Sequence, residues 1–495
     1  MLRIFNVATL YFKNSCGLRH YTTMIRTYTD AINKLNSLQS NAAVLEMLRK
    51  KGRSENKRSL PEMREYCKRI GYQTSEFDSL NIIHVAGTKG KGSTCAFTES
   101  ILRHCEGISG KPLRTGLYTS PHLIAVRERI RIDGRPLSEE QFAKYFFECW
   151  DRLEATKGEV PEGQPEKPVY FRFLTLLAFH VFMQEKIDVV VLEVGVGGEY
   201  DSTNIVERPV VCGITSLGLD HVAVLGNTLE DIAWNKAGII KSGVPVFSVM
   251  QPEECLRVIE KRAAEKNAPL SILSNGSDSF TNLGLAGEHQ RANAALAVAL
   301  SKQWLGTMRG QTLKDDIPRE FERGLTAVKW PGRAQTLTVT GYKATWYLDG
   351  AHTAESMQAC IDWFGKTLEN KEKQRILLFN CTNGRDGAAL LRTLSTLQSQ
   401  VKFDHALFCT NITYADNTYK GDNQNNMVNP DDKLLLQHGF AQSWSQLVPE
   451  CNAHVFPTVE HATKWVKDQG DAEVLVTGSL QLVGNVMTVL GVEPQ

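Results

Sequence analysis

The stretch NIIHVAGTKGKGST, residues 81–94, decides the fold, because an apolar run is followed at once by a glycine-rich loop. Ile82, Ile83 and Val85 predict a buried strand. The loop contains three glycines, which remove the Cβ atoms that would keep backbone N–H groups away from an anion: Gly87, Gly90 and Gly92. Lys91 can then reach the terminal phosphates of a nucleotide. The stretch therefore predicts a phosphate-binding loop.

A helical pattern follows the loop, with apolar or small residues at helical spacing between Cys95 and Cys105. The N–H groups and dipole of such a helix would face the same phosphates. The motif is not a strict P-loop, because Val85 replaces a glycine and Gly92 separates Lys91 from the next hydroxyl, Ser93. An ordinary glycine-rich turn is the alternative. The order of strand, glycines, lysine, hydroxyl and helix favours a nucleotide site.

Length and composition limit the possible classes of protein. A chain of 495 residues is expected to form two or more domains. Its 42% hydrophobic residues and net charge of +1 favour neither disorder nor a polycation that binds nucleic acid. The 11 cysteines include no CxxC pair, which indicates free thiols. The apolar run 173–182 is too short to cross a bilayer, so it predicts a core helix and no transmembrane segment is expected.

The N-terminal 30 residues have the composition of a mitochondrial presequence. No acidic residue precedes Asp30, while four basic residues do: Arg3, Lys13, Arg19 and Arg26. We expect import into the mitochondrial matrix, and a cytosolic form if translation starts at Met24. A terminal extension without any targeting role is the alternative.

Polar residues follow several predicted strands of the N-terminal part, after two helices expected over 41–52 and 61–71. Ser120 follows a short strand and could be a simple turn serine. Glu193 ends the apolar run 187–193, where α/β sheets bind ligands, although it could be a structural acid. His221 follows the strand 209–215 and could be a satisfied loop residue. Lys236 ends a helical pattern, where it could pair with the helix dipole or lie in solvent.

A second α/β unit begins after the breakers at 329–333. Strands are expected at 344–348, 376–379, 405–410 and 473–476, and they precede Asp349, His352 and Ser479. In the N-terminal unit, Gln290 and Asn293 open an alanine-rich helix that they could cap, or they could contact a purine. The Asn- and Asp-rich segment 413–432 predicts a mobile surface insertion.

The chain resembles the folylpolyglutamate synthases of the eukaryotic type, within the Mur-ligase-like amide-bond-forming enzymes. The shared motifs occur in the family's order: GTKGKGST, TSPHL, FRFLT, EVGVGGEYDSTN, LDH, WNKAGIIK, GEHQRANA, KWPGR, LDGAHT and VTGSLQLVG. The resemblance implies a two-lobed α/β fold. A P-loop domain with a mostly parallel sheet would cover residues 31–328, and a Rossmann-like α/β domain that binds glutamate would cover 329–495, after the targeting segment 1–30.

The resemblance also implies roles for individual residues. Those implied to bind ATP are Thr88, Lys89, Gly90, Lys91, Gly92, Ser93, Asn293, Arg333 and Asp349. Those implied to bind magnesium are Ser120, Glu193 and His221. Lys91, Lys236 and His352 are implied to be catalytic, and Lys236 matches a lysine that is carbamylated in related ligases. His352 and Ser479 match positions near the incoming glutamate.

The implied reaction joins L-glutamate to the γ-carboxylate of a reduced folate, with ATP and Mg²⁺ and with room for a monovalent cation such as K⁺. ATP would phosphorylate the carboxylate, and the glutamate amine would attack the acyl phosphate. A monomer is expected. Dihydrofolate synthase, which joins glutamate to dihydropteroate, uses the same motifs, but FRFLT and the leader favour the polyglutamate enzyme. A nucleotide-dependent switch is a third reading, which the polar residues after the second set of strands disfavour.

Overall fold

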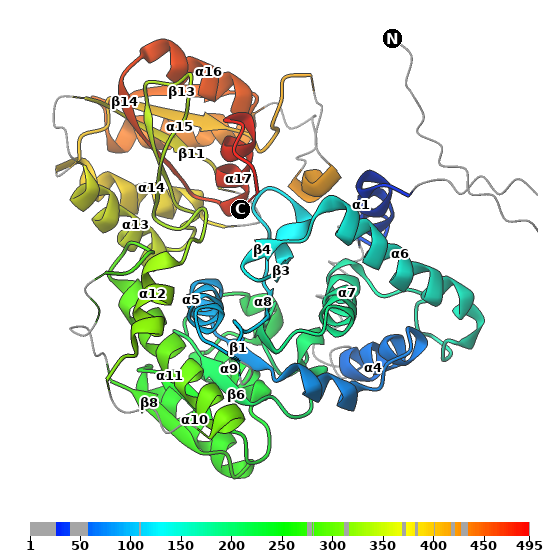
Figure 1. Ribbon diagram of the computed structural model, residues 1–495. Coiled ribbons are helices and arrows are strands. Elements are labelled where there is room, and N and C mark those ends of the chain that lie inside the picture. The colour runs from blue at the N-terminus through cyan, green and yellow to red at the C-terminus, as the bar shows by residue number, and fades with distance from the viewer. Residues whose placement is uncertain are drawn as a thin grey trace, which may run out of the picture.

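A computed structural model describes most of the chain. The described residues are 26–39, 58–107, 110–274, 280, 282–310, 316–368, 373–381, 385–399, 401–416, 421–426 and 434–494. The predicted helix at 41–52 and nearly all of the predicted targeting segment lie outside these residues. The described part folds into two α/β lobes, each built on its own sheet (Figure 1).

The N-terminal lobe contains an eight-stranded sheet that is parallel except at one edge, where β3 and β4 run antiparallel. The predicted phosphate-loop strand, β1, lies inside the sheet between β5 and β6. In spatial order the strands are β4 (Arg135–Pro136), β3 (Ile130–Ile132), β2 (Thr115–Tyr118), β5 (Val189–Glu193), β1 (Ile83–Ala86), β6 (Val211–Ile214), β7 (Val246–Val249) and β8 (Leu270–Leu273).

Helices cover both faces of this sheet because its central strands are apolar on both sides. One face packs against α5 (Lys91–Arg103), α11 (His289–Arg309) and α12 (Arg319–Ala327). The other packs against α4 (Ser59–Arg69), α6 (Glu139–Ala155), α7 (Tyr170–Gln184), α9 (Leu229–Lys236) and α10 (Glu253–Glu265). Helix α1 (Tyr28–Asn36) joins the α6 side, and α8 (Val222–Leu225) follows β6. The predicted core helix is α7. No helix in the described part is long and apolar enough to cross a bilayer.

The C-terminal lobe contains a six-stranded sheet, parallel except for β9. In spatial order its strands are β13 (Asn452–Phe456), β12 (His405–Cys409), β11 (Gln374–Phe379), β14 (Ala472–Thr477), β10 (Thr345–Leu348) and β9 (Gln335–Thr338). One face packs against α13 (Ala354–Thr367), α14 (Gly387–Ser395) and α15 (Leu435–Leu447), and the other against α16 (Val459–Gln469) and α17 (Leu480–Val489). We propose that the two domains divide between residues 328 and 329, in the segment that connects α12 to β9.

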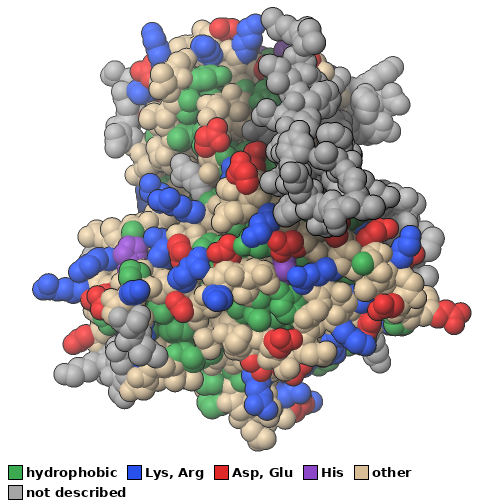
Figure 2. All heavy atoms as spheres, turned by 45° about the vertical axis from the view of Figure 1, so that its right-hand side comes forward, with side chains coloured by type: hydrophobic (Ala, Val, Ile, Leu, Met, Phe, Trp, Pro, Cys, Tyr) green, Lys and Arg blue, Asp and Glu red, His purple; other side chains and the backbone are tan. Residues whose placement is uncertain are grey.

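The lobes interlock at the loop that follows β2. Leu123 and Ile124 of this loop are buried in the core that α16 and α17 form on the C-terminal sheet. A Cβ atom on Gly484 of α17 would lie 2.0 Å from the carbonyl oxygen of Leu123, so only glycine allows this approach. Figure 2 shows charged side chains gathered along the junction of the lobes.

The sequence predicted a mobile surface insertion at 413–432, and this prediction is wrong for residues 421–426, which the structure describes. The short 3₁₀ helix η8 (Gly421–Asn426) lies beside α1 (Figure 1). Asn423 is 5% exposed, and the side chain of Asn36 in α1 donates to the carbonyl of Gly421 at 2.8 Å. Composition suggested solvent here because Asn and Asp are common in loops, but Gly421 is hydrogen-bonded by the other lobe and the Asn423 side chain donates to Asn485 of α17 in its own lobe.

Candidate active site

The phosphate loop packs so closely against its neighbours that two of its positions, Gly90 and Gly92, have little room for a side chain. Gly90 has a φ of +84°, and a Cβ atom on it would lie 2.2 Å from the side-chain oxygen of Asn293. A Cβ atom on Gly92 would lie 3.2 Å from the indole nitrogen of Trp330. The loop therefore lies between the head of α11 and the segment that connects the lobes. The helix predicted to follow the loop is α5, which begins at Lys91.

The two lysines of the loop have different surroundings. Lys91 lies 3.4 Å from the carbonyl oxygen of Thr88, within its own loop. Lys89 lies 3.4 Å from a carboxylate oxygen of Asp220 and 3.3 Å from Nε2 of His352 in the C-terminal lobe. Burial lowers the pKa of Lys89, and Asp220 opposes that shift. Lys89 thus links the N-terminal loop to the C-terminal lobe.

Ser120 and Glu193 are in contact, although they follow different strands. The backbone N–H of Ser120 donates to Oε2 of Glu193 at 3.0 Å. The Glu193 side chain is almost fully buried, and this burial raises its pKa, while the charges of Lys91 and Arg333 oppose the rise. Glu193 therefore lies buried beside two positively charged side chains.

His221 and Lys236 differ sharply in exposure. His221 is exposed, with a left-handed φ of 52°, and its N–H donates to Asp220 at 2.9 Å. Among the described contacts, no hydrogen bond joins His221 to Ser120 or Glu193. Lys236 is 4% exposed, and its ammonium donates to the carbonyl of Gly87 at 2.7 Å. The solvent alternative for Lys236 is therefore wrong.

Electrostatics make Lys236 unusual. Burial lowers its pKa well below that of an ordinary lysine, and the nearby positive charge of Lys91 lowers it further. Asp220 and Asp201 act in the opposite direction. An amine in such surroundings loses its proton more readily, so it is more reactive toward an electrophile than a solvated lysine.

The head of α11 brings further polar groups to the loop. Asn293 donates to Oε1 of Gln290 at 2.9 Å, and the amide of Gln290 lies 3.4 Å from the hydroxyl of Ser93. Gln290 and Asn293 are almost fully buried. His289 feels the charges of Asp349 and Arg333, so the head of α11 lies near the C-terminal residues predicted to bind nucleotide.

The predicted residues of the C-terminal lobe are held mainly by neighbouring backbone. Asp349 accepts hydrogen bonds from the N–H groups of Ala334 at 2.8 Å and Ala351 at 2.9 Å. His352 Nδ1 lies 2.7 Å from the carbonyl of Gly350, and burial lowers the His352 pKa to about 3. Ser479 caps α17 with its hydroxyl.

Burial also shifts the pKa values of Asp349 and Arg333. It raises the pKa of Asp349 and lowers that of Arg333, and each charge opposes the shift of the other. Both residues come from the start of the C-terminal lobe, where a Cβ atom on Gly350 would lie 2.8 Å from the Arg333 guanidinium.

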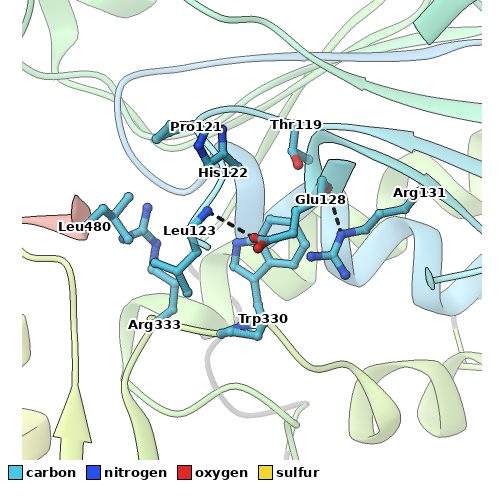
Figure 3. A pocket seen from close by; sticks show the side chains of 10 residues that line it. Thr119, Pro121, His122, Leu123, Glu128, Arg131, Trp330, Arg333 and Leu480 are labelled. Atoms are coloured by element: carbon cyan, nitrogen blue, oxygen red, sulfur yellow. Dashed lines mark hydrogen bonds between the residues drawn. The ribbon is translucent and has the colours of Figure 1, made fainter. Parts of the chain in front are cut away.

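A small pocket lies between the lobes beside this site (Figure 3). Its lining includes His122, Glu128, Arg131, Trp330 and Arg333. The guanidinium of Arg131 lies 5.0 Å from the centre of the Trp330 ring, a cation–π contact. Since Trp330 also contacts Gly92, the connecting segment joins this pocket to the phosphate loop.

Two residues of the site had no assigned role in the sequence. Asp220 pairs with Lys89, and its position directly before His221 at a strand end was the available signal. Trp330 packs on the phosphate loop, and its place in KWPGR was visible only as a domain boundary.

The residues available for a divalent cation are one buried carboxylate, one hydroxyl and one imidazole. Glu193 and the loop of Ser120 are in contact and suit Mg²⁺, which prefers oxygen ligands and keeps several waters. Within the described part of the chain, no group of three or more His, Cys, Asp or Glu side chains could hold a metal ion. The Ser120–Glu193 pair fits magnesium bound mainly by water and phosphate.

Curated relatives resemble the chain over almost its whole length. A folylpolyglutamate synthase of Saccharomyces cerevisiae (strain FostersO) is 45% identical over 94% of this chain and 87% of its own. The mitochondrial folylpolyglutamate synthase of Bos taurus is 42% identical over 94% and 92%. A folylpolyglutamate synthase of Neurospora crassa is 44% identical over 95% and 93%. A family model described as "Dihydrofolate synthetase, C-terminal domain" matches residues 333–489.

Solved structures share the fold. Mycobacterium tuberculosis folylpolyglutamate synthase complexed with ADP and AMPPCP superposes with a TM-score of 0.72 at 22% identity, over 94% of this chain and 100% of its own. E. coli FolC in complex with DHPP and ADP gives 0.68 at 24% identity, over 94% and 98%. The two-lobed α/β fold implied by the sequence motifs is thus confirmed. Because relatives at 42–45% identity span almost the entire chain, it belongs to the folylpolyglutamate synthase family.

Proposed function

We propose that this chain is an ATP-dependent ligase that joins L-glutamate to the γ-carboxylate of tetrahydrofolate and its polyglutamates. The products are the extended folate, ADP and phosphate. The observation that carries the proposal is the meeting of Lys89 with His352, because it places the phosphate loop of one lobe against the predicted glutamate-binding edge of the other. Nucleotide and amino acid substrates can then share one cleft.

The reaction needs an activated acyl group, because a free carboxylate does not react with an amine. Lys91 would neutralise charge on the γ-phosphoryl group as it passes to the folate carboxylate. The loop from Thr88 to Ser93 would hold the phosphates, and Asn293, Arg333 and Asp349 would hold the rest of the nucleotide. His352 and Ser479 would orient glutamate so that its amine attacks the acyl phosphate and phosphate leaves.

Magnesium belongs to this proposal as a bound ion held by Glu193 and Ser120, with His221 as a further ligand. When bound, it would supply positive charge to the transferring phosphoryl group. The hydrogen bond from the backbone N–H of Ser120 to Glu193 supports the proximity of the two oxygen-bearing residues. His221 is exposed, so its role as a ligand is tested by mutation. A monovalent cation such as K⁺ is compatible with the same cleft.

Lys236 is proposed to act after carbamylation. Its burial and lowered pKa favour the uncharged amine, which is the form that adds to carbon dioxide. The resulting carbamate would replace a cation by an anion beside Lys91. Intact-protein mass measurement under bicarbonate, on wild type and Lys236→Arg, tests this point, because only wild type should gain the mass of carbon dioxide.

Dihydrofolate synthase is the alternative, and the description of the matching C-terminal family model is the observation that favours it. The two activities are separated by incubating the purified chain with ATP, Mg²⁺ and L-glutamate, with either tetrahydrofolate or dihydropteroate. Mass spectrometry should find a glutamate added to tetrahydrofolate, with ADP released in step. A product from dihydropteroate alone would replace our proposal by the alternative.

We also propose that residues 1–30 direct the chain to the mitochondrial matrix, that initiation at Met24 gives a cytosolic form, and that the enzyme is a monomer. The name of the bovine relative supports the mitochondrial part. A fusion of residues 1–30 to a fluorescent reporter should enter mitochondria, and the chain begun at Met24 should not. A cytosolic reporter would contradict the targeting proposal.

A further inference from the structure

Asp422 of the C-terminal lobe contacts the loop that carries Ser120 in the N-terminal lobe. Its Oδ1 accepts a hydrogen bond from the backbone N–H of Val126 at 2.7 Å. Its backbone carbonyl accepts one from Nε2 of His122 at 3.0 Å. Tyr28, at the start of α1, donates its hydroxyl to the same Oδ1. One residue of the C-terminal lobe therefore holds two points of this loop and the first helix.

The protonation of His122 is fixed by its two partners. Arg129 donates to Nδ1 at 2.9 Å, so Nδ1 must be the unprotonated nitrogen and Nε2 must carry the proton given to Asp422. Both ring nitrogens of His122 therefore have a hydrogen-bond partner, one from each lobe.

Two carboxylates accept hydrogen bonds from successive backbone N–H groups of the loop. Glu128 accepts from the N–H groups of Leu123 at 3.0 Å, Ile124 at 2.9 Å and Ala125 at 2.7 Å. Figure 3 shows Glu128 directed at the backbone of Leu123. Asp422 accepts from the next N–H, that of Val126. Glu128 belongs to the N-terminal lobe and Asp422 to the C-terminal lobe, so the last donor of the series is satisfied only when the lobes are correctly placed.

The same loop begins beside the predicted metal site. Two residues before His122, the N–H of Ser120 donates to Glu193. Between Ser120 and Val126, Leu123 and Ile124 are buried in the C-terminal core, and their burial confines the loop. A displacement of Asp422 would therefore be transmitted over a few residues to the Ser120–Glu193 contact, since charge-assisted hydrogen bonds to buried backbone are costly to lose.

We propose that Asp422 is a positioning residue that couples the placement of the C-terminal lobe to the geometry of Ser120 and Glu193. The proposal rests on the function proposed above. Without Asp422 the lobes lose register, and water reaches the acyl phosphate before the glutamate amine does. Water then cleaves the acyl phosphate to the free carboxylate and phosphate, so ATP is consumed without formation of an amide.

The test compares ADP released with amide formed in the purified full-length chain, a ratio that does not depend on how much enzyme is active. Wild type should release about one ADP for each amide, and Asp422→Ala should raise that ratio about twofold or more. Asp422→Asn keeps an acceptor for Val126 and Tyr28, so it should return most of the way to wild type. The control is Asp362→Asn, an exposed residue that bonds only with Gln358 of its own helix among the described contacts and should leave the ratio unchanged.

Tyr28→Phe supplies a second variant, useful if Asp422→Ala does not fold. It removes one donor to Asp422, so it should raise the ratio less, and it should add nothing in the Asp422→Ala background. A wild-type ratio in Asp422→Ala would overturn the proposal, as would full additivity of Tyr28→Phe. Wild type that forms no amide would refute the proposed function instead. In that case, faster hydrogen exchange of residues 122–126 in Asp422→Ala would still support the hold of Asp422 on this loop, and unchanged exchange would oppose it.

Discussion

The two lobes differ in how they hold the polar residues at the carboxyl ends of their strands. At the edge in the N-terminal lobe, Glu193 and Lys236 are buried ionisable groups with shifted pKa values, and the described contacts give each side chain one hydrogen-bond partner, the N–H of Ser120 and the carbonyl of Gly87. At the edge in the C-terminal lobe, Asp349 and His352 also have shifted pKa values, but Asp349 accepts from two backbone N–H groups, His352 lies against the carbonyl of Gly350, and Ser479 caps α17. The first edge therefore leaves its ionisable groups more hydrogen-bonding capacity for a substrate or an ion, whereas the second holds its polar groups in fixed positions.

The largest effect on activity should come from a mutation at the strand edge of the N-terminal lobe. Lys91→Ala should lower turnover by about two to three orders of magnitude, because in the proposed mechanism the transferring phosphoryl group would lose the positive charge of Lys91. Steady-state kinetics with ATP and tetrahydrofolate measure the loss, and circular dichroism checks the fold. Lys91→Arg is the matched control for charge. Turnover like that of wild type in Lys91→Ala would remove the phosphate-loop assignment.

A smaller effect should follow from the proposed metal ligands. Glu193→Gln should raise the magnesium concentration for half-maximal activity about tenfold or more. His221→Ala should raise it less, because His221 is exposed. Mn²⁺ accepts nitrogen ligands more readily and should rescue Glu193→Gln better than Mg²⁺ does. An unchanged magnesium requirement in both variants would return these residues to structural roles.

A mutation at the strand edge of the C-terminal lobe should have a weaker effect, and the effect should be on the binding of ATP. Asp349→Asn keeps one oxygen for the N–H groups of Ala334 and Ala351 but loses the charge beside Arg333. We expect the KM for ATP to rise several-fold, about three to ten times, with kcat nearly unchanged. A loss confined to kcat would place Asp349 in the chemical step and weaken the contrast between the edges.

The smallest effect concerns stability in acid. His352 has a folded pKa of about 3, below the ordinary histidine value, so the unfolded chain binds the extra proton first as the pH falls. The contribution of the neutral His352 imidazole to the free energy of unfolding is fully present above about pH 6.5 and is lost progressively toward pH 3. Between pH 7.5 and 5.5, wild type should lose about 1 kcal/mol more unfolding free energy than His352→Asn. Urea titrations at both pH values would measure this, and equal losses would show that the imidazole is not buried as described.

The sequence predicted the elements that carry strong local patterns. The strand before Lys91 and the strand ending at Glu193 were visible because both are mainly apolar runs followed by a glycine-rich loop. Strands such as β7 and β13 were missed, since β7 has only four residues and β13 is partly exposed. Asp422 could not be found at all, because its partners lie about 300 and 400 residues away in a segment whose composition indicates a loop.

The central claim is that ATP activates the folate γ-carboxylate as an acyl phosphate. The most direct test uses tetrahydrofolate carrying ¹⁸O in that carboxylate, with ATP, Mg²⁺ and L-glutamate. Phosphoryl transfer followed by amine attack leaves one carboxylate oxygen on the departing phosphate. Mass spectrometry should therefore find one ¹⁸O in inorganic phosphate for each amide formed, together with ADP. Label in AMP, or unlabelled phosphate alongside normal amide formation, would contradict the account.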